Sequence, residues 1–330
     1  MTKPTTLIWH RDVAKVVNRD WIRFLLADVV SDEIVDLEGK ICHPYSIIVE
    51  DNRCKTPNAF FEAATRHGPV GLFHVFDEYF DFDYGKYRYF DFVIKTWWSS
   101  AFEADRILCV PIGYTSDLPL KAGVPLASER PLLWSFAGAL KSVRYHMVKS
   151  LSDAQPHSVF APSSLVGRLS KGEYFEVLEN SIFAPCPMGN VLLESWRLYE
   201  SLEAGCIPII ERRPFMRYYE RLLSDPPLPF VWNWKEAKRK MLALADDPTE
   251  LDRMQQEIHQ WWERFKSSLK RRIATLVGEG FSRRAGPGPG GVRVKRVAEL
   301  PGWRYGELLR HQSLQSLRWR VQKNLLGAGL

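Results

Sequence analysis

The segment that most constrains the fold of this chain is residues 181–211, which read SIFAPCPMGNVLLESWRLYESLEAGCIPIIE. Residues 181–185 form a short apolar run that ends near Gly189, a residue free to adopt positive φ. Residues 206–210 are apolar and partly β-branched, as in a strand buried on both faces. The pattern predicts two parallel strands of an open α/β sheet, joined through a loop and a helix.

The helix between these strands is expected to present its N-terminus to a ligand. Asn190 is a suitable N-cap, and Gly205 fits the C′ position after a helix that ends at Ala204. In open α/β sheets, phosphates and nucleotides bind at helix N-termini beside the carboxyl ends of strands. The loop before Asn190 is therefore a candidate nucleotide-binding loop.

The same helix carries Arg197 and Glu200, which stand three positions apart and so share one face. Spacing alone is equally compatible with a simple ion pair on the protein surface, which is the commoner role of such residues.

The whole stretch resembles the donor-binding half of exostosin-type glycosyltransferases, family 47 of the carbohydrate-active enzymes. In that family an F-x-x-x-P-x-G loop leads into S-x-R-x-x-E-x-L-x-x-G-C-I-P. The matching residues here are Phe183, Pro187, Gly189, Ser195, Arg197, Glu200, Leu202, Gly205, Cys206, Ile207 and Pro208. The resemblance implies a nucleotide-sugar site built from Pro187, Gly189, Asn190, Ser195, Arg197 and Glu200. In it, Arg197 would contact or support the diphosphate, and Glu200 would bind the ribose hydroxyls or fix Arg197.

A second candidate phosphate site lies upstream, where the strand-like run 132–137 (LLWSFA) precedes Gly138 and a basic helix. This segment is similar to the family's F-x-G…R segment, which contributes basic contacts to the donor diphosphate. Gly138 and Arg144 match it, and Lys141 is a further candidate. The alternative is a solvated basic helix face.

The first part of the chain alternates strand-like and helix-like segments. Runs rich in β-branched and aromatic residues recur at 45–50, 70–76, 90–95 and 107–111, which predicts a mainly parallel, Rossmann-like sheet. Residues 90–117 also resemble the family's N-terminal domain.

We therefore expect an α/β protein of the GT-B class, with two facing Rossmann-like domains. The expected divisions are an N-terminal acceptor-side domain at 1–125 and a nucleotide-sugar-binding domain at 126–277. The second includes a long charged helix that crosses back to the first. A Gly/Pro linker at 278–292 and a basic amphipathic tail at 293–330 would complete the chain.

Charge is concentrated in that tail. Residues 293–330 hold eight basic and two acidic residues, which account for the whole net charge of +6. A basic catalytic surface or a nucleic-acid partner does not follow from this distribution. Leucines alternate with the basic residues, which predicts peripheral contact with an anionic membrane or a partner enzyme, or else a last helix packed on the body. The leucines are Leu308, Leu309, Leu314, Leu317, Leu325 and Leu326.

Other signals indicate a cytoplasmic enzyme without a metal or cofactor. No run approaches the roughly 20 apolar residues of a membrane span, and the five cysteines lack the CxxC spacing of metal sites. Family members in eukaryotes usually carry an N-terminal anchor. The D-x-D sequence formed by Asp81 and Asp83 has the form of a GT-A metal motif, but three letters recur by chance.

The resemblance implies an inverting glycosyltransferase that moves a sugar from a UDP-sugar to a hydroxyl of a glycan acceptor. Inversion requires a base in the first domain, at the end of a strand. Asp77 is our first candidate and Glu78 the second, and Glu50 and Asp51 also fit. Each could instead cap a helix. The alternative function is a non-catalytic carbohydrate- or polyanion-binding protein that retains the fold.

Overall fold

The computed structural model describes residues 4–11, 17–51, 55–120, 123–141, 143–162, 169–214, 216–284 and 288–312. The chain forms two compact units. Unit 1 comprises Met1–Ser116 and Arg264–Glu307, and unit 2 comprises Asp117–Glu263 and Leu308–Leu330. The chain therefore passes between the units three times.

Unit 1 contains a parallel sheet with the order β2-β1-β3-β4-β5-β6, six strands within the described residues. The central strands β3 and β4 are buried along their whole length, because helices cover both faces of a parallel sheet. The strands are β1 (Thr6–His10), β2 (Asp32–Asp36), β3 (Ser46–Asp51), β4 (Val70–Val75), β5 (Phe92–Thr96) and β6 (Ile107–Val110).

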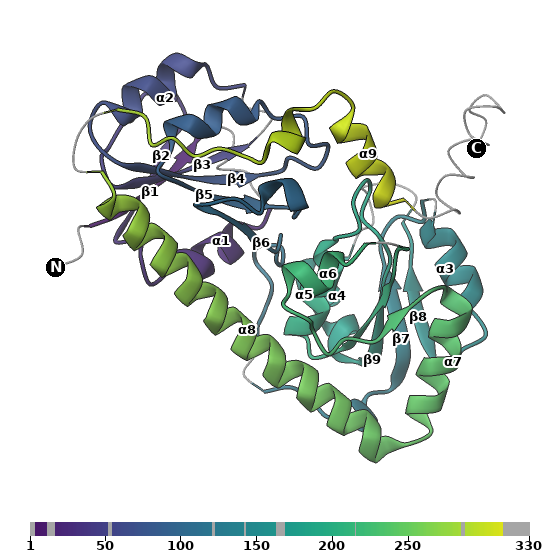
Figure 1. The fold of residues 1–330 in the computed structure, drawn as a ribbon. Helices are drawn as coiled ribbons and strands as arrows, with labels where there is room; N and C mark the ends of the chain where they lie inside the picture. The colour runs from purple at the N-terminus through teal and green to yellow at the C-terminus, as the bar shows by residue number, and fades with distance from the viewer. Residues whose placement is uncertain are drawn as a thin grey trace. The chain divides into compact units, whose positions relative to one another are not determined.

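The connections of unit 1 place helices on opposite faces of this sheet. Helix α1 (Arg19–Leu26) leads from β1 outward to β2, whereas α2 (Asn58–Thr65) leads from β3 to β4 in the other direction. Because such crossovers are right-handed, opposite directions put the two helices on opposite faces, as Figure 1 shows. The strand order thus reverses between β1 and β3.

Unit 2 contains a second parallel sheet, with the order β11-β10-β9-β7-β8, counted over the part of the chain that is described. The strands are β7 (Leu132–Ala137), β8 (His157–Phe160), β9 (Ser181–Cys186), β10 (Ile207–Glu211) and β11 (Phe230–Val231). Helices α3 (Val143–Leu151) and α7 (Trp234–Ala245) pack together on one face (Figure 1). The other helices of this sheet are α4 (Lys171–Glu179), α5 (Trp196–Glu203) and α6 (Tyr218–Leu222).

The segment expected to be a free linker is bound to unit 1. Helix α8 (Pro248–Ser282) continues past Val277, and the boundary between the units falls within it. Arg284 then pairs with Asp91 at 3.0 Å. The backbone N–H of Gly291 donates to the Arg88 carbonyl at 2.7 Å. The described part of residues 278–292 therefore has fixed hydrogen-bond partners.

The beginning of the predicted tail is also packed. Val292 is buried, and helix α9 (Trp303–Arg310) brings the Trp303 ring against Phe80 and Phe102 of unit 1. Leu309 is exposed. These contacts support the packed-helix alternative for residues 292–312. The remaining residues of the predicted amphipathic pattern, from Leu314 to Leu326, lie outside the described part of the chain.

Candidate donor site

A pocket of about 580 Å³ lies at the carboxyl ends of β7 and β9 in unit 2. The strand order reverses between these two strands, since β8 lies on one side of β7 and the later strands lie on the other. Open α/β sheets bind their ligands at this kind of position. The lining residues are Ala137, Gly138, Ala139, Lys141, Arg144, Phe160, Pro162, Leu169, Tyr174, Asn190, Ser195, Trp196, Arg197 and Glu200.

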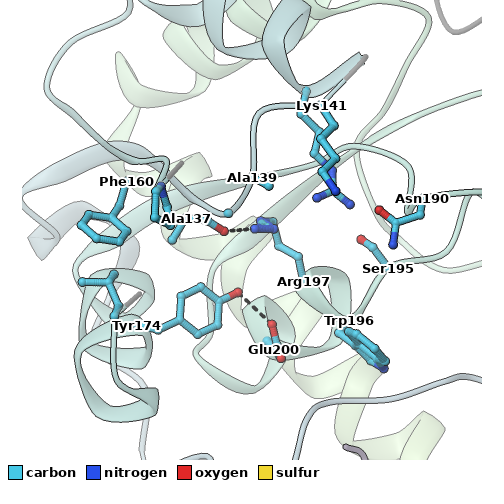
Figure 2. A pocket seen from close by; sticks show the side chains of 14 residues that line it. Ala137, Ala139, Lys141, Phe160, Tyr174, Asn190, Ser195, Trp196, Arg197 and Glu200 are labelled. Atoms are coloured by element: carbon cyan, nitrogen blue, oxygen red, sulfur yellow. Dashed lines mark hydrogen bonds between the residues drawn. The ribbon is translucent and has the colours of Figure 1, made fainter. Parts of the chain in front are cut away.

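Most of the residues predicted for the nucleotide-sugar site line this one pocket, although they come from two distant segments of the chain. Those that do so are Gly138, Lys141, Arg144, Asn190, Ser195, Arg197 and Glu200. Pro187 and Gly189 are not lining residues. Figure 2 shows the side chains of Lys141, Asn190, Ser195 and Arg197 pointing toward a common space.

The helix of the central segment begins later than predicted. Ser195, not Asn190, occupies the N-cap position of α5, and the residues between them form a loop. Within this loop the Gly189 N–H donates to the Leu192 carbonyl at 2.9 Å. A Cβ on Gly189 would lie 2.6 Å from the Glu194 carbonyl oxygen, so this fold of the loop requires glycine. Gly189 therefore shapes the site without lining it.

Arg197 is held in place by contacts within unit 2. Its guanidinium lies 4.2 Å from the centre of the Phe136 ring and donates a hydrogen bond to the Ala137 carbonyl. Gly138 has a φ of +149°, and a Cβ there would lie 3.0 Å from a guanidinium nitrogen of Arg197. The glycine after β7 therefore permits both the backbone turn and the close approach of the arginine.

Glu200 is buried beside a tyrosine that the sequence did not reveal as a site residue. The Tyr174 hydroxyl donates to Glu200 Oε2 at 2.8 Å (Figure 2). Burial and the neighbouring carboxylate raise the pKa of Tyr174 well above its usual value, so the hydroxyl remains a donor. Tyr174 lies on α4, and no residue spacing in the sequence connects that helix to Glu200.

Two helix N-termini face this pocket. Lys141 and Arg144 flank the start of α3, while Ser195 and Trp196 begin α5. Helix N-termini carry unpaired N–H groups and partial positive charge, and three cationic side chains add to it. The arrangement is suited to a phosphate or diphosphate group, with a carboxylate at one end for hydroxyl groups.

Comparison with known families agrees with this geometry. Residues 110–237 match the family model described as the Exostosin GT47 domain, and every residue lining the pocket falls within that range. The match spans 128 of the 330 residues, and over this range the chain is similar to an exostosin GT47 domain. The chain is accordingly a glycosyltransferase, as the sequence resemblance implied.

Solved structures show the fold of this glycosyltransferase. A crystal structure of an α1,3-fucosyltransferase matches with a TM-score of 0.52 and 11% identity, covering 84% of this chain and 91% of that one. Anabaena HepE in complex with UDP-glucose matches with a TM-score of 0.50 and 9% identity, covering 84% of this chain and 100% of that one. These are GT-B enzymes, which confirms the predicted GT-B class with its two parallel sheets. No curated protein matches in sequence.

Unit 1 of the glycosyltransferase has a polar cluster at its own point of strand reversal. His10 ends β1 and Glu50 lies near the end of β3, and His10 Nδ1 is 2.5 Å from Glu50 Oε2. The Thr56 hydroxyl donates to Glu50 Oε1 at 2.6 Å. All three residues are buried, and His10 Nε2 has no hydrogen-bond partner among the described residues. The sequence pointed to Glu50 as an alternative base, but it gave no sign of the contact with His10.

Both carboxylate oxygens of Asp77, the first candidate for the base, have hydrogen-bond or ion-pair partners. Its Oδ2 lies 2.7 Å from Lys95 Nζ and accepts from the Tyr84 hydroxyl at 2.5 Å. Its Oδ1 accepts from the backbone N–H groups of Asp81 and Phe82. A general base needs a lone pair open to the acceptor hydroxyl. The geometry therefore favours a structural role for Asp77. Glu78, the second candidate, is half-buried.

The two aspartates of the D-x-D sequence each contact another part of unit 1. Asp83 accepts from the Gly85 N–H as a cap, and Asp81 lies 3.7 Å from Arg304. Over the described ranges, no group of three His, Cys, Asp or Glu side chains is arranged to hold a metal ion. No helix in this part of the chain has the length and hydropathy to cross a bilayer.

Proposed function

We propose that this glycosyltransferase transfers a sugar from a UDP-sugar to a hydroxyl of a glycan acceptor, with inversion at the anomeric carbon and without a metal ion. The observation that carries the proposal is the convergence of two helix N-termini and three cations on one pocket. Its volume of about 580 Å³ suits a ligand of this size. The known complex of HepE with UDP-glucose supports the choice of nucleotide.

The leaving group of this reaction is a nucleoside diphosphate, whose negative charge increases as the glycosidic bond breaks. Arg197 offers a planar pair of donors to phosphate oxygens, and Lys141 and Arg144, which line the same pocket, add positive charge. These groups would stabilise the leaving diphosphate where other enzymes use a metal ion. Glu200 would accept hydrogen bonds from the two ribose hydroxyls.

Donor binding can be tested by thermal unfolding in the presence of UDP-sugars, GDP-sugars and free uridine. Ligand at 100 times its Kd stabilises the native state by about 2.7 kcal/mol, so the correct donor should raise the Tm. Uridine lacks the diphosphate and should have little effect. Turnover, measured as UDP release, should persist in EDTA. Loss of turnover in EDTA with recovery on adding Mn²⁺ would contradict the metal-free mechanism, and binding without release would favour the non-catalytic alternative.

The base of the proposed reaction is His10, supported by Glu50. Its free Nε2 lies at the strand reversal of unit 1, and the Glu50 carboxylate can stabilise the imidazolium formed when Nε2 takes the acceptor proton. A Cβ at Gly39 would lie 2.7 Å from Nε2, so glycine at this position lets the backbone pack closely against the ring. Because the ring is buried, acceptor binding would have to open this site.

His10→Asn should lower turnover by roughly 10²-fold or more while leaving the affinity for UDP unchanged. The imidazole lies in the unit that does not hold the donor pocket, so donor binding should not depend on it. Steady-state kinetics and calorimetric titration with UDP provide the two measurements. Turnover near that of the native protein would exclude His10 and return attention to Glu78 or Asp51.

A further inference from the structure

The last described residues of the chain are attached to the loop that forms one wall of the donor pocket. His311 and Gln312, here called the clasp, are both buried in unit 2. His311 Nδ1 accepts from the Leu193 N–H at 3.0 Å, and Gln312 Nε2 donates to the Val191 carbonyl at 2.8 Å. The Arg213 side chain donates to the His311 carbonyl at 3.0 Å and fixes the clasp in turn.

The clasped residues belong to the donor loop, defined as residues 189–195. Asn190 and Ser195 of this loop line the pocket, and Val191 and Leu193 lie between them in sequence. The loop has further anchors on its buried side. Glu194 accepts from the hydroxyls of Tyr199 and Tyr218, and Tyr219 donates to the Leu193 carbonyl. The clasp therefore adds, from a segment more than a hundred residues away in the chain, to a set of bonds at Val191, Leu193 and Glu194.

Because the loop contains no helix or strand, its backbone has few partners of its own. We propose that His311 and Gln312 are positioning residues for the donor site: they hold the backbone at Val191 and Leu193, so that Asn190 and Ser195 face the nucleotide-sugar. This inference rests on the proposed function, in which the pocket binds the donor. The clasp itself does not line the pocket.

The chemistry of His311 fits this role. To accept from an N–H, Nδ1 must be unprotonated. Burial, together with Arg213 and Arg310, lowers the pKa of His311 to about 3, so the ring is neutral at ordinary pH. The ring also packs edge-on against Tyr218, 5.1 Å between centroids, which fixes its orientation. An asparagine at this position could place an amide oxygen near the site of Nδ1, whereas a leucine could not accept.

The test compares His311→Leu, His311→Asn and Gln312→Leu with the native protein. UDP and GDP are titrated by calorimetry, and hydrogen exchange is followed at the amides of the donor loop. His311→Leu should weaken binding of whichever nucleotide the native protein binds by about tenfold or more and speed exchange at Leu193. His311→Asn should restore both to within about threefold. Leu309→Ala, an exposed change near the end of the preceding helix α9, serves as the control.

The outcomes distinguish a failure of the positioning role of the clasp from a failure of the proposed donor binding. If His311→Leu does not fold, Gln312→Leu, which removes only the bond to Val191, provides the same comparison. Unchanged nucleotide affinity in folded clasp variants, with native binding intact, would overturn the positioning role alone. Failure of the native protein to bind either nucleotide would overturn the proposed function and the inference drawn from it. Equal loss of affinity in Leu309→Ala would also refute a specific role for the clasp.

Discussion

Arg197→Ala should abolish detectable UDP binding and lower turnover by roughly 10²- to 10³-fold, the range seen when one donor to a developing anion is removed. The side chain is the cation that extends from α5 into the pocket, where its guanidinium is already oriented by the Ala137 carbonyl and the Phe136 ring. Preorientation means that little order has to be gained when the diphosphate binds. Calorimetry with UDP and kinetics with the donor identified by thermal unfolding would measure both effects.

Two further variants make this result specific. Arg197→Lys retains the charge but lacks the planar pair of donors, so it should recover only part of the affinity. Arg253→Ala removes an arginine that pairs with Glu250 on the exposed face of α8 and should leave nucleotide binding unchanged. A large drop in Tm in Arg197→Ala, without a selective loss of UDP binding, would instead show that the arginine mainly stabilises the fold.

Asp77→Asn should reduce the free energy of unfolding by about 3–5 kcal/mol, as expected when one partner of a buried ion pair is removed. Lys95 and Asp77 are almost completely buried, and their charged atoms lie 2.7 Å apart. The neutral amide would leave the ammonium group without a counter-charge among the rings of Phe80, Tyr84 and Phe102. Urea unfolding, followed by circular dichroism, would measure the change.

The double variant Asp77→Asn/Lys95→Met should recover much of that loss, because it removes the uncompensated charge together with its partner. The exposed pair of Asp153 and Lys238 offers a matched comparison, and Asp153→Asn should have little effect on stability. If Asp77→Asn retained the native unfolding free energy but lost turnover, the carboxylate would be catalytic after all.

The sequence was most informative where the residues within or next to a helix or strand indicate where it begins or ends. The run LLWSFA before Gly138 predicted the strand that the structure has as β7, Leu132–Ala137. Glycine with positive φ was also recognisable at the end of α5, where Gly205 has a φ of +67°. A Cβ added at Gly205 would lie 2.0 Å from the Val124 side chain, and this close approach is visible only in the folded chain.

Contacts between distant segments could not be derived from local pattern. The sequence placed Arg144 and Arg197 in one site only through a family resemblance, and the sheet explains it: β7 and β9 are neighbours although β8 separates them in sequence. The ion pair of Asp77 could not be foreseen either, because nothing in the residues around it signals that Lys95 will lie against its carboxylate. The contact between His10 and Glu50 could not be foreseen, since the two residues are forty positions apart in the chain.

The start of α5 shows a second reason why the sequence alone did not predict the structure. Asn190 is a good N-cap by residue type, yet the bonds from Tyr199, Tyr218 and His311 hold residues 191–194 in an extended loop. Tertiary hydrogen bonds therefore override local capping preference over these residues. A prediction from single-residue preferences could not anticipate them, because two of the three partners lie outside the βαβ unit.

The interleaving of the two units along the chain has a consequence for protein engineering. A chimera designed to exchange donor specificity would naturally transplant one contiguous block, such as Asp117–Glu263. That block lacks His311 and Gln312, which belong to unit 2 but follow the last segment of unit 1 in the chain. A functional graft therefore has to carry two inserts, and natural recombination would face the same requirement. An exchange of the donor half between relatives would therefore have to preserve all three crossings between the units.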